Sequence, residues 1–143
     1  MTDLKLVIFD VDGTLVDSQG DILAAMQVAF GAVGVPVPAR ADVLGIVGLS
    51  LPEAMLRLAP DVDAPRRAQM VEAYKSAYAA QVTAKASPLY DGIPAALDRL
   101  SEIDGVLLGI ATGKSRRGLT RLLAEHDMAD RFVTTQVADD HPS

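Results

Sequence analysis

The sequence predicts an α/β fold in which a parallel sheet of about three strands is interrupted, after its first strand, by a block of helices. Short apolar runs rich in β-favouring residues occur at 4–9, 106–111 and 132–137. The segments between these runs have apolar residues at helical spacing. Strands that alternate with helices are typical of parallel pairing with right-handed crossovers.

The first run, Leu4 to Phe9, is expected to form a buried strand because nearly all of its residues are apolar. Asp12-Gly13 ends this strand, and Ser18 is a suitable N-cap for the helix that follows. Gly34 suits the position just after that helix. The apolar face of the helix is expected to carry Ile22, Met26, Phe30 and Val33.

Residues 20–85 show no strand pattern and are expected to be helical. Ser50 to Glu53 has the pattern of a capping box at the start of a short helix. Asp63 and Pro65 predict the start of a longer helix. One face of that helix is expected to carry Met70, Tyr74, Tyr78 and Val82.

The alternation of helices and strands resumes after Pro88. One helix is expected to carry Ile93, Leu97, Leu100 and Ile103, and Ser115 is expected to cap another that carries Leu119, Leu122 and Leu123. The sequence therefore predicts two domains. They are an α/β core, made of residues 1–18 and 86–143, and a helical domain over residues 19–85.

Composition excludes several classes of protein. The chain has 143 residues, 13 Lys+Arg against 19 Asp+Glu and a net charge of −6, which argues against a general nucleic-acid binder. It has no Cys, so disulfide scaffolds, thiol catalysis and thiolate metal sites are excluded. The apolar run near the start is too short for a signal peptide or a membrane span. We expect a soluble, cytoplasmic protein that does not bind membranes.

Two carboxylates, Asp10 and Asp12, follow the first predicted strand directly. Ligands bind at this end of the strands in open α/β sheets. An aspartate held there is able to attack phosphorus, a second is able to transfer a proton, and both offer oxygen ligands suited to Mg²⁺. A plain hairpin turning at Asp12-Gly13 is the alternative. An EF-hand loop is excluded because Leu15 stands where that loop needs glycine.

The second polar segment is Thr112-Gly113-Lys114-Ser115, between a predicted strand and a predicted helix. Free N–H groups at the helix start, the Thr112 hydroxyl and the Lys114 charge would together suit a phosphate group. A P-loop is excluded because only three residues separate Gly109 from Gly113, where that motif needs four. An ordinary strand-to-helix turn explains this segment equally well. The basic cluster of Arg116, Arg117 and Arg121 is interpreted as a solvated face.

These segments together resemble the haloacid dehalogenase-like hydrolase superfamily, and within it enzymes of the phosphoglycolate phosphatase type with a small helical cap. Residues 10–18 match the first motif of the superfamily, residues 110–114 match the second, and residues 20–85 correspond to the cap. The resemblance implies a Rossmann-like core. It further implies hydrolysis of a small phosphorylated metabolite with Mg²⁺ as cofactor.

The resemblance also implies a role for each motif residue. Asp10 would be the nucleophile that forms an aspartyl-phosphate, and Asp12 the general acid and base. Mg²⁺ would be held by the Asp10 carboxylate and the Asp12 backbone carbonyl. The implied phosphate-binding residues are Thr14, Thr112, Gly113 and Lys114. The second aspartate favours phosphoryl transfer over carbon–halogen cleavage, because the dehalogenases of the superfamily lack it.

The sequence departs from the superfamily pattern at its C-terminal end. The third-motif lysine and the acidic fourth motif are absent, and residues 139–143 resemble the segment that leads up to that lysine. We therefore expect a fragment with weak activity or none, which self-associates through the open edge of the first strand. A sugar-phosphate mutase and a non-catalytic binding or assembly module remain alternative functions.

Overall fold

The computed structural model describes residues 3–141, which form two compact units. The α/β unit comprises the chain up to Asp17 and from Pro88 onward, and the helical unit is Ser18–Ser87. The α/β unit contains strands β1 (Lys5–Phe9), β2 (Val106–Ala111) and β3 (Thr134–Gln136), helices α5 (Ile93–Ser101) and α6 (Arg116–Glu125), and the 3₁₀ turns η1 (Ala129–Arg131) and η2 (Ala138–Asp140).

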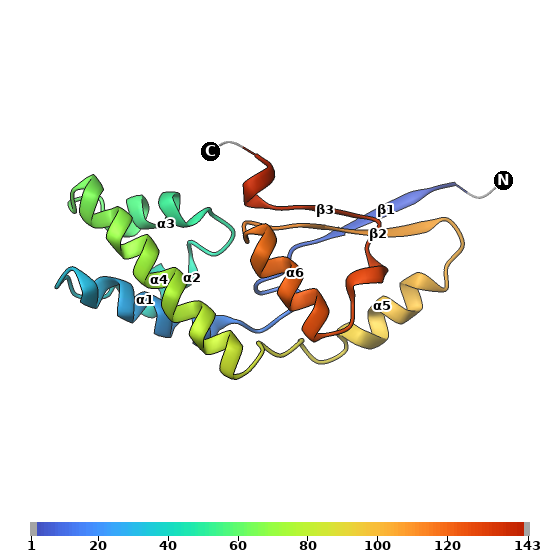
Figure 1. Ribbon diagram of the computed structural model, residues 1–143. Helices are drawn as coiled ribbons and strands as arrows, with labels where there is room; N and C mark the ends of the chain where they lie inside the picture. Colours follow the sequence, from blue (N-terminus) through green and yellow to red (C-terminus); the bar gives the residue numbers. More distant parts are fainter. Residues whose placement is uncertain (1–2, 142–143) are drawn as a thin grey trace. The chain divides into compact units, whose positions relative to one another are not determined.

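The three strands form one parallel sheet in the order β1-β2-β3. Helices α5 and α6, which connect successive strands, lie along the same side of the sheet (Figure 1). Their buried residues Leu97 and Leu119 belong to one apolar cluster with Leu108 and Ile110 of β2. The predicted α/β fold with about three parallel strands is therefore confirmed.

The other face of the sheet is exposed, and the prediction that the first strand is buried is wrong for this face. Alternate side chains of β1 point to opposite faces. Val7 and Phe9 pack against the apolar cluster, but Leu6 and Ile8 are 48% and 57% exposed. Leu107, the register partner of Leu6 on β2, is also exposed. The physical reason is that both connecting helices cover the opposite face.

The helical unit contains α1 (Gln19–Ala32), α2 (Arg40–Leu44), α3 (Leu51–Leu58) and α4 (Ala64–Ala84), as the helical pattern predicts. Its core is formed mainly by aliphatic, methionine and aromatic side chains. The largest fully buried ones are Phe30, Met26, Met55, Met70 and Val43. None of the helices in the described part of the chain is both long and apolar enough to cross a membrane.

The helix starts of this unit differ in how they are capped. The Asp63 carboxylate accepts a hydrogen bond from the Arg66 amide at 2.9 Å and caps α4 as predicted. Ser50 precedes α3, but its side chain makes no capping hydrogen bond, so the predicted capping box is wrong. The Ser50 hydroxyl oxygen is instead buried with no hydrogen-bond partner among the described residues.

Candidate active site

The predicted catalytic segments leave the sheet at one edge. Strands β1 and β2 are parallel, with Phe9 opposite Ile110, so the loop after β1 and the turn after β2 begin side by side. Parallel pairing also excludes the antiparallel hairpin as the explanation of Asp12-Gly13. This edge, at the carboxyl ends of the strands, is the ligand-binding edge of open α/β sheets.

The loop after β1 is closed around the carbonyl of the buried residue Val11. That oxygen accepts hydrogen bonds from the amides of Thr14, Leu15 and Val16 at 3.1, 2.9 and 3.1 Å. Gly13 has a φ of +81°, a value that favours glycine, and its amide donates to the Val16 carbonyl at 3.0 Å. The loop therefore has a fixed backbone.

Three of the predicted site residues lie on this loop. The Asp10 side chain is exposed, and one of its oxygens accepts a hydrogen bond from the Val11 amide at 2.7 Å. Asp12 is half-buried, and Thr14 is exposed. Asp10 thus combines an accessible carboxylate with a restrained orientation, which a nucleophile needs.

Hydrogen bonds to β3 and within the turn itself fix the backbone of the turn after β2. The Thr112 amide donates to the Gln136 carbonyl at 3.0 Å, and the Lys114 amide donates to the Thr112 hydroxyl oxygen at 3.1 Å. The Ser115 hydroxyl accepts from the Gly118 amide at 3.1 Å, which confirms Ser115 as the N-cap of α6. Within residues 3–141 the Gly113 amide has no acceptor, so its N–H is available to an anion.

Lys114 joins the two segments. Its ammonium nitrogen lies 3.3 Å from a carboxylate oxygen of Asp12, and the two side chains are only 11% and 16% exposed. Charges that are this far removed from water interact more strongly than exposed ones. Sequence reasoning included both residues but missed their ion pair, because they are 102 positions apart and only the parallel pairing of β1 with β2 brings them together.

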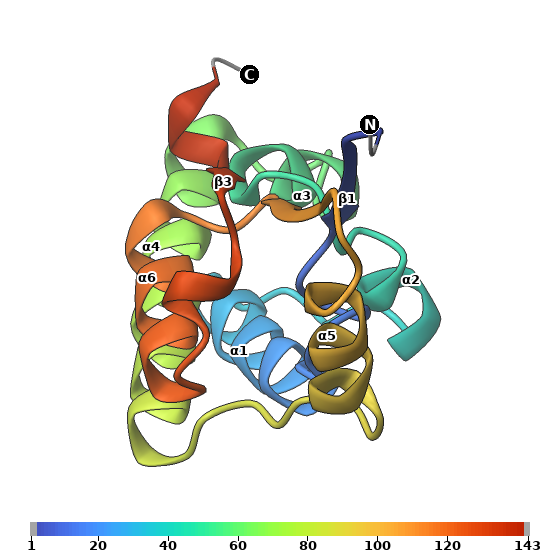
Figure 2. The same cartoon turned by 90° about the vertical axis from the view of Figure 1, so that its right-hand side faces the viewer.

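The interpretation of Arg116 as part of a solvated face is wrong, because its guanidinium makes three hydrogen bonds to other residues. Its guanidinium donates to the Thr135 hydroxyl at 2.5 Å, to the Thr135 carbonyl at 3.1 Å and to an Asp140 carboxylate oxygen at 2.8 Å. In Figure 1 and Figure 2, η2 directly follows β3 and lies near the first turn of α6. The arginine therefore connects the start of α6 both to β3 and to the turn η2 after it.

The described residues offer few ligands for a metal ion. No group of three or more His, Cys, Asp and Glu side chains among them is arranged to hold one. The Asp10 carboxylate and the Asp12 backbone carbonyl are oxygen donors, which is the donor type that Mg²⁺ prefers. His141 is a hydrogen-bond partner of Gln136, with 2.9 Å between the His141 Nε2 and Gln136 Oε1 atoms.

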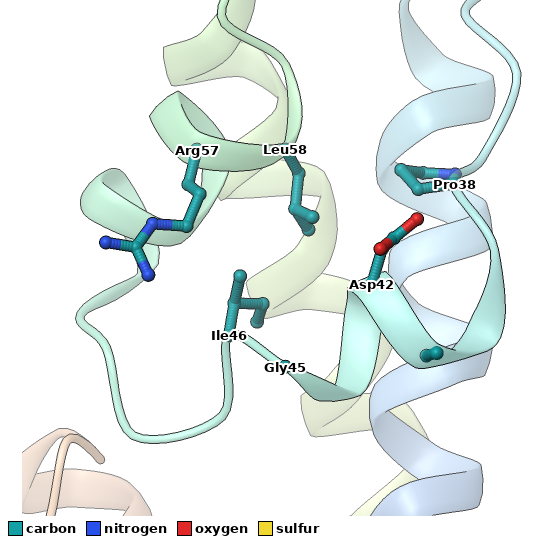
Figure 3. Close-up of a pocket in the computed structure, with 7 residues that line it drawn as sticks. Pro38, Asp42, Gly45, Ile46, Arg57 and Leu58 are labelled. Atoms are coloured by element: carbon teal, nitrogen blue, oxygen red, sulfur yellow. The ribbon is translucent and has the colours of Figure 1, made fainter.

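A separate hollow lies within the helical unit, between α2 and α3. Its volume is about 390 Å³, and it is lined by Pro38, Ala41, Asp42, Gly45, Ile46, Arg57 and Leu58. Figure 3 shows Ile46 and Leu58 between Arg57 on one side and Asp42 on the other. None of the predicted site residues lines this hollow.

The model of the haloacid dehalogenase-like hydrolase family matches residues 7–142. The chain belongs to this family. The match includes both segments that meet at the carboxyl edge of the sheet. The family assignment agrees with the resemblance noted from the sequence.

The chain is similar to curated relatives and a solved structure that are named as phosphatases, and to a relative named as a kinase. A phosphoglycolate phosphatase of Vibrio vulnificus is 33% identical over 98% of this chain and 64% of its own length. A tyrosine-protein kinase, PtkA, of Mycobacterium tuberculosis is 34% identical over 90% of this chain and 42% of its own length. A predicted phosphoglycolate phosphatase from Haemophilus somnus has the same fold, with a TM-score of 0.86 at 21% identity over 100% of this chain and 66% of that one. The chain thus spans about two thirds, or less, of the proteins it matches.

Proposed function

We propose that the chain carries the catalytic residues of a Mg²⁺-dependent phosphomonoester hydrolase whose substrate is a small phosphorylated metabolite, as for phosphoglycolate phosphatase. The observation that best supports this proposal is the Lys114–Asp12 pair, which places a cation beside a carboxylate where the two strands end. The exposed Asp10 and the available Gly113 N–H lie on the same two segments. The residues proposed as nucleophile, proton-transfer group and anion-binding groups therefore lie on two segments that begin at one edge of the sheet.

In the proposed reaction a carboxylate oxygen of Asp10 attacks phosphorus, and the bond between phosphorus and the ester oxygen breaks. Asp12 in its acid form gives a proton to the departing oxygen, which leaves as an alcohol. Water then attacks phosphorus and Asp12 accepts its proton. Breaking the bond between phosphorus and Asp10 releases inorganic phosphate and regenerates the Asp10 carboxylate. Thr112, Gly113 and Lys114 hold the phosphoryl oxygens, and Thr14 lies on the nucleophile loop as a further donor.

The Asp10 carboxylate and the Asp12 carbonyl would hold Mg²⁺. When bound, the ion reduces the repulsion between the anionic nucleophile and the anionic phosphate. The residues present fit this role only in part, because the described chain provides no cluster of three ligands. We therefore propose that this 143-residue chain turns over slowly.

The test is phosphate release from 2-phosphoglycolate at high chain concentration with Mg²⁺. We expect slow release that Asp10→Asn abolishes, while the exposed Asp91→Asn, on a turn elsewhere in the α/β unit, leaves the rate unchanged. Release that survives in Asp10→Asn would contradict the proposed nucleophile. Turnover near the common enzyme value of about 10 s⁻¹ would contradict only the proposed low activity.

Transfer of the phosphoryl group to an acceptor other than water is a second candidate function. The relative named as a tyrosine-protein kinase supports it. A sugar-phosphate mutase, the alternative that the family resemblance implies, would use the same aspartate pair. Both candidate functions share the attack by Asp10 and differ in what attacks next. Conversion of a sugar phosphate into its isomer without release of phosphate would favour transfer.

We further propose that the chain self-associates through β1. Within the described residues β1 pairs only with β2, so its other edge has unpaired backbone groups, and Leu6 and Ile8 beside that edge are exposed. Light scattering should therefore show a mass that rises with concentration. Replacing Ile8 by Lys should reduce the rise. A monomer at all concentrations would contradict this proposal.

A further inference from the structure

Arg116 is the first residue of α6, and four hydrogen bonds tie it to β3 and to the turn η2 that follows this strand. Three are made by its guanidinium to the Thr135 hydroxyl, the Thr135 carbonyl and the Asp140 carboxylate. The fourth is made by its backbone amide, which donates to an Asp139 carboxylate oxygen at 3.0 Å. One residue thus binds both ends of the stretch 135–140.

The middle of the same stretch is bonded to the turn that precedes Arg116. The Gln136 carbonyl accepts from the Thr112 amide at 3.0 Å, and the Ala138 amide donates to the Lys114 carbonyl at 3.0 Å. Whatever fixes residues 135–140 therefore also fixes the backbone of Thr112 and Lys114.

An arginine suits this position because its planar guanidinium carries several donors in a fixed arrangement. A lysine would supply the charge from a single nitrogen and would not reproduce the bonds to both Thr135 and Asp140. The side chains of Arg116 and Asp140 are 42% and 38% exposed, so their ion pair adds little to the free energy of unfolding. The effect expected of such a network is on geometry.

We propose that Arg116 is a positioning residue for the phosphate-binding turn, which it orients through Thr135 and Asp140. This inference rests on the function proposed above for Thr112, Gly113 and Lys114. Arg116 itself is not proposed to touch the substrate. Its removal lets the end of β3 shift, and the Thr112 hydroxyl and the Lys114 ammonium then lose their mutual orientation.

The test compares Arg116→Ala and Arg116→Lys with Arg117→Ala, which removes the same charge from an exposed neighbour on α6. The first measurement is the affinity for inorganic phosphate with Mg²⁺. The second is amide hydrogen exchange at Thr112 and Ala138, and the third is the denaturation midpoint. We expect Arg116→Ala to raise the Kd for phosphate about tenfold. We expect exchange at the two amides to become at least about tenfold faster with little change in the midpoint.

Arg116→Lys should recover part of both effects, and Arg117→Ala should match the wild type. Equal phosphate affinity in Arg116→Ala and Arg117→Ala would overturn the inference. Faster exchange throughout the α/β unit of Arg116→Ala, together with a lowered denaturation midpoint, would also overturn it, because this result indicates only a structural role for Arg116. If the wild type binds no phosphate, the proposed function of the turn is contradicted. Exchange at Thr112 and Ala138 then decides separately whether Arg116 orients the turn.

Discussion

The helical unit and the α/β unit both have apolar cores, but they place their charged groups differently. In the helical unit the ion pair between Lys75 and Glu72 is on the surface, with side chains 58% and 76% exposed. In the α/β unit Lys114 and Asp12 form a pair that is largely withdrawn from water. Withdrawing charges from water is costly, so such a pair is weak evidence for a stabilising role. The Lys114–Asp12 pair therefore needs an explanation other than stability, and the proposed function supplies one.

The largest effect on stability is expected from the core of the helical unit. Phe30 is buried on α1, and Phe30→Ala should lower the free energy of unfolding by about 3–5 kcal/mol, because it leaves a cavity. Urea denaturation followed by circular dichroism measures this. Val28→Ala on the same helix is the control, because Val28 is exposed. This substitution should change the free energy of unfolding by less than about 0.5 kcal/mol. Similar effects of the two substitutions would contradict the described core.

The second largest difference in the free energy of unfolding is expected between substitutions in the two ion pairs. Lys114→Met leaves the Asp12 carboxylate half-buried without this partner and should cost about 1–3 kcal/mol. Lys75→Met should cost less than about 0.5 kcal/mol, because its pair is exposed. A double-mutant cycle with Asp12→Asn isolates the coupling between Lys114 and Asp12. Equal costs for the two lysine substitutions would remove the contrast between the units.

The two serines that precede helices should show a smaller contrast. Ser115→Ala removes a capping hydrogen bond from α6 and should cost about 1 kcal/mol. Ser50→Ala should be neutral or slightly stabilising, because it removes a buried hydroxyl that has no partner in the described part of the chain. Thermal unfolding of the two variants checks this. A loss in Ser50→Ala as large as in Ser115→Ala would show that Ser50 does cap α3.

The smallest expected effect is that of low pH on the hydrogen bonds made by Asp140. The Val137 N–H, and then the Arg116 guanidinium, lower the pKa of Asp140 below its ordinary value. The contribution of ionised Asp140 is therefore present above about pH 4 and is lost as the pH falls through the lowered pKa. Protection of the Ala138 amide, measured relative to its intrinsic exchange rate at each pH, should thus fall in the wild type only below about pH 4. Asp140→Asn should show the reduced protection already at neutral pH. An identical pH profile in both proteins would contradict this assignment.

The fold class could be predicted because local signals agreed with it. The apolar runs that became β1 and β2 end where Asp10 and Thr112 begin, and Ser115 caps α6 as its type suggests. The exposure of Leu6 and Ile8 could not be predicted in this way. Hydrophobicity shows that a side chain is suited to burial, but the sequence pattern does not say which face of a sheet the helices cover.

The contacts of the candidate site depend on long-range pairing and were harder to predict. Arg116 lies in a run of basic residues that suggests a solvated face, yet its partners Thr135 and Asp140 follow 19 and 24 positions later. Ser50 shows a different limit. The capping pattern with Glu53 is present in the sequence, but the Ser50 hydroxyl makes no capping hydrogen bond and is buried without a partner among the described residues. The roles of Asp10 and Asp12 remain predictions that the experiments above address.

The strand order β1-β2-β3 has a consequence for how the chain is made. Since the strands leave the ribosome in the same order in which they lie side by side, each new strand finds its neighbour already synthesised. β2 pairs with β1, and β3 pairs with β2, so neither pairing depends on a segment synthesised later. The hydrogen bonds between β1 and β2 also need not break for β3 to join the sheet. The sheet can therefore assemble by addition at one growing edge while translation continues.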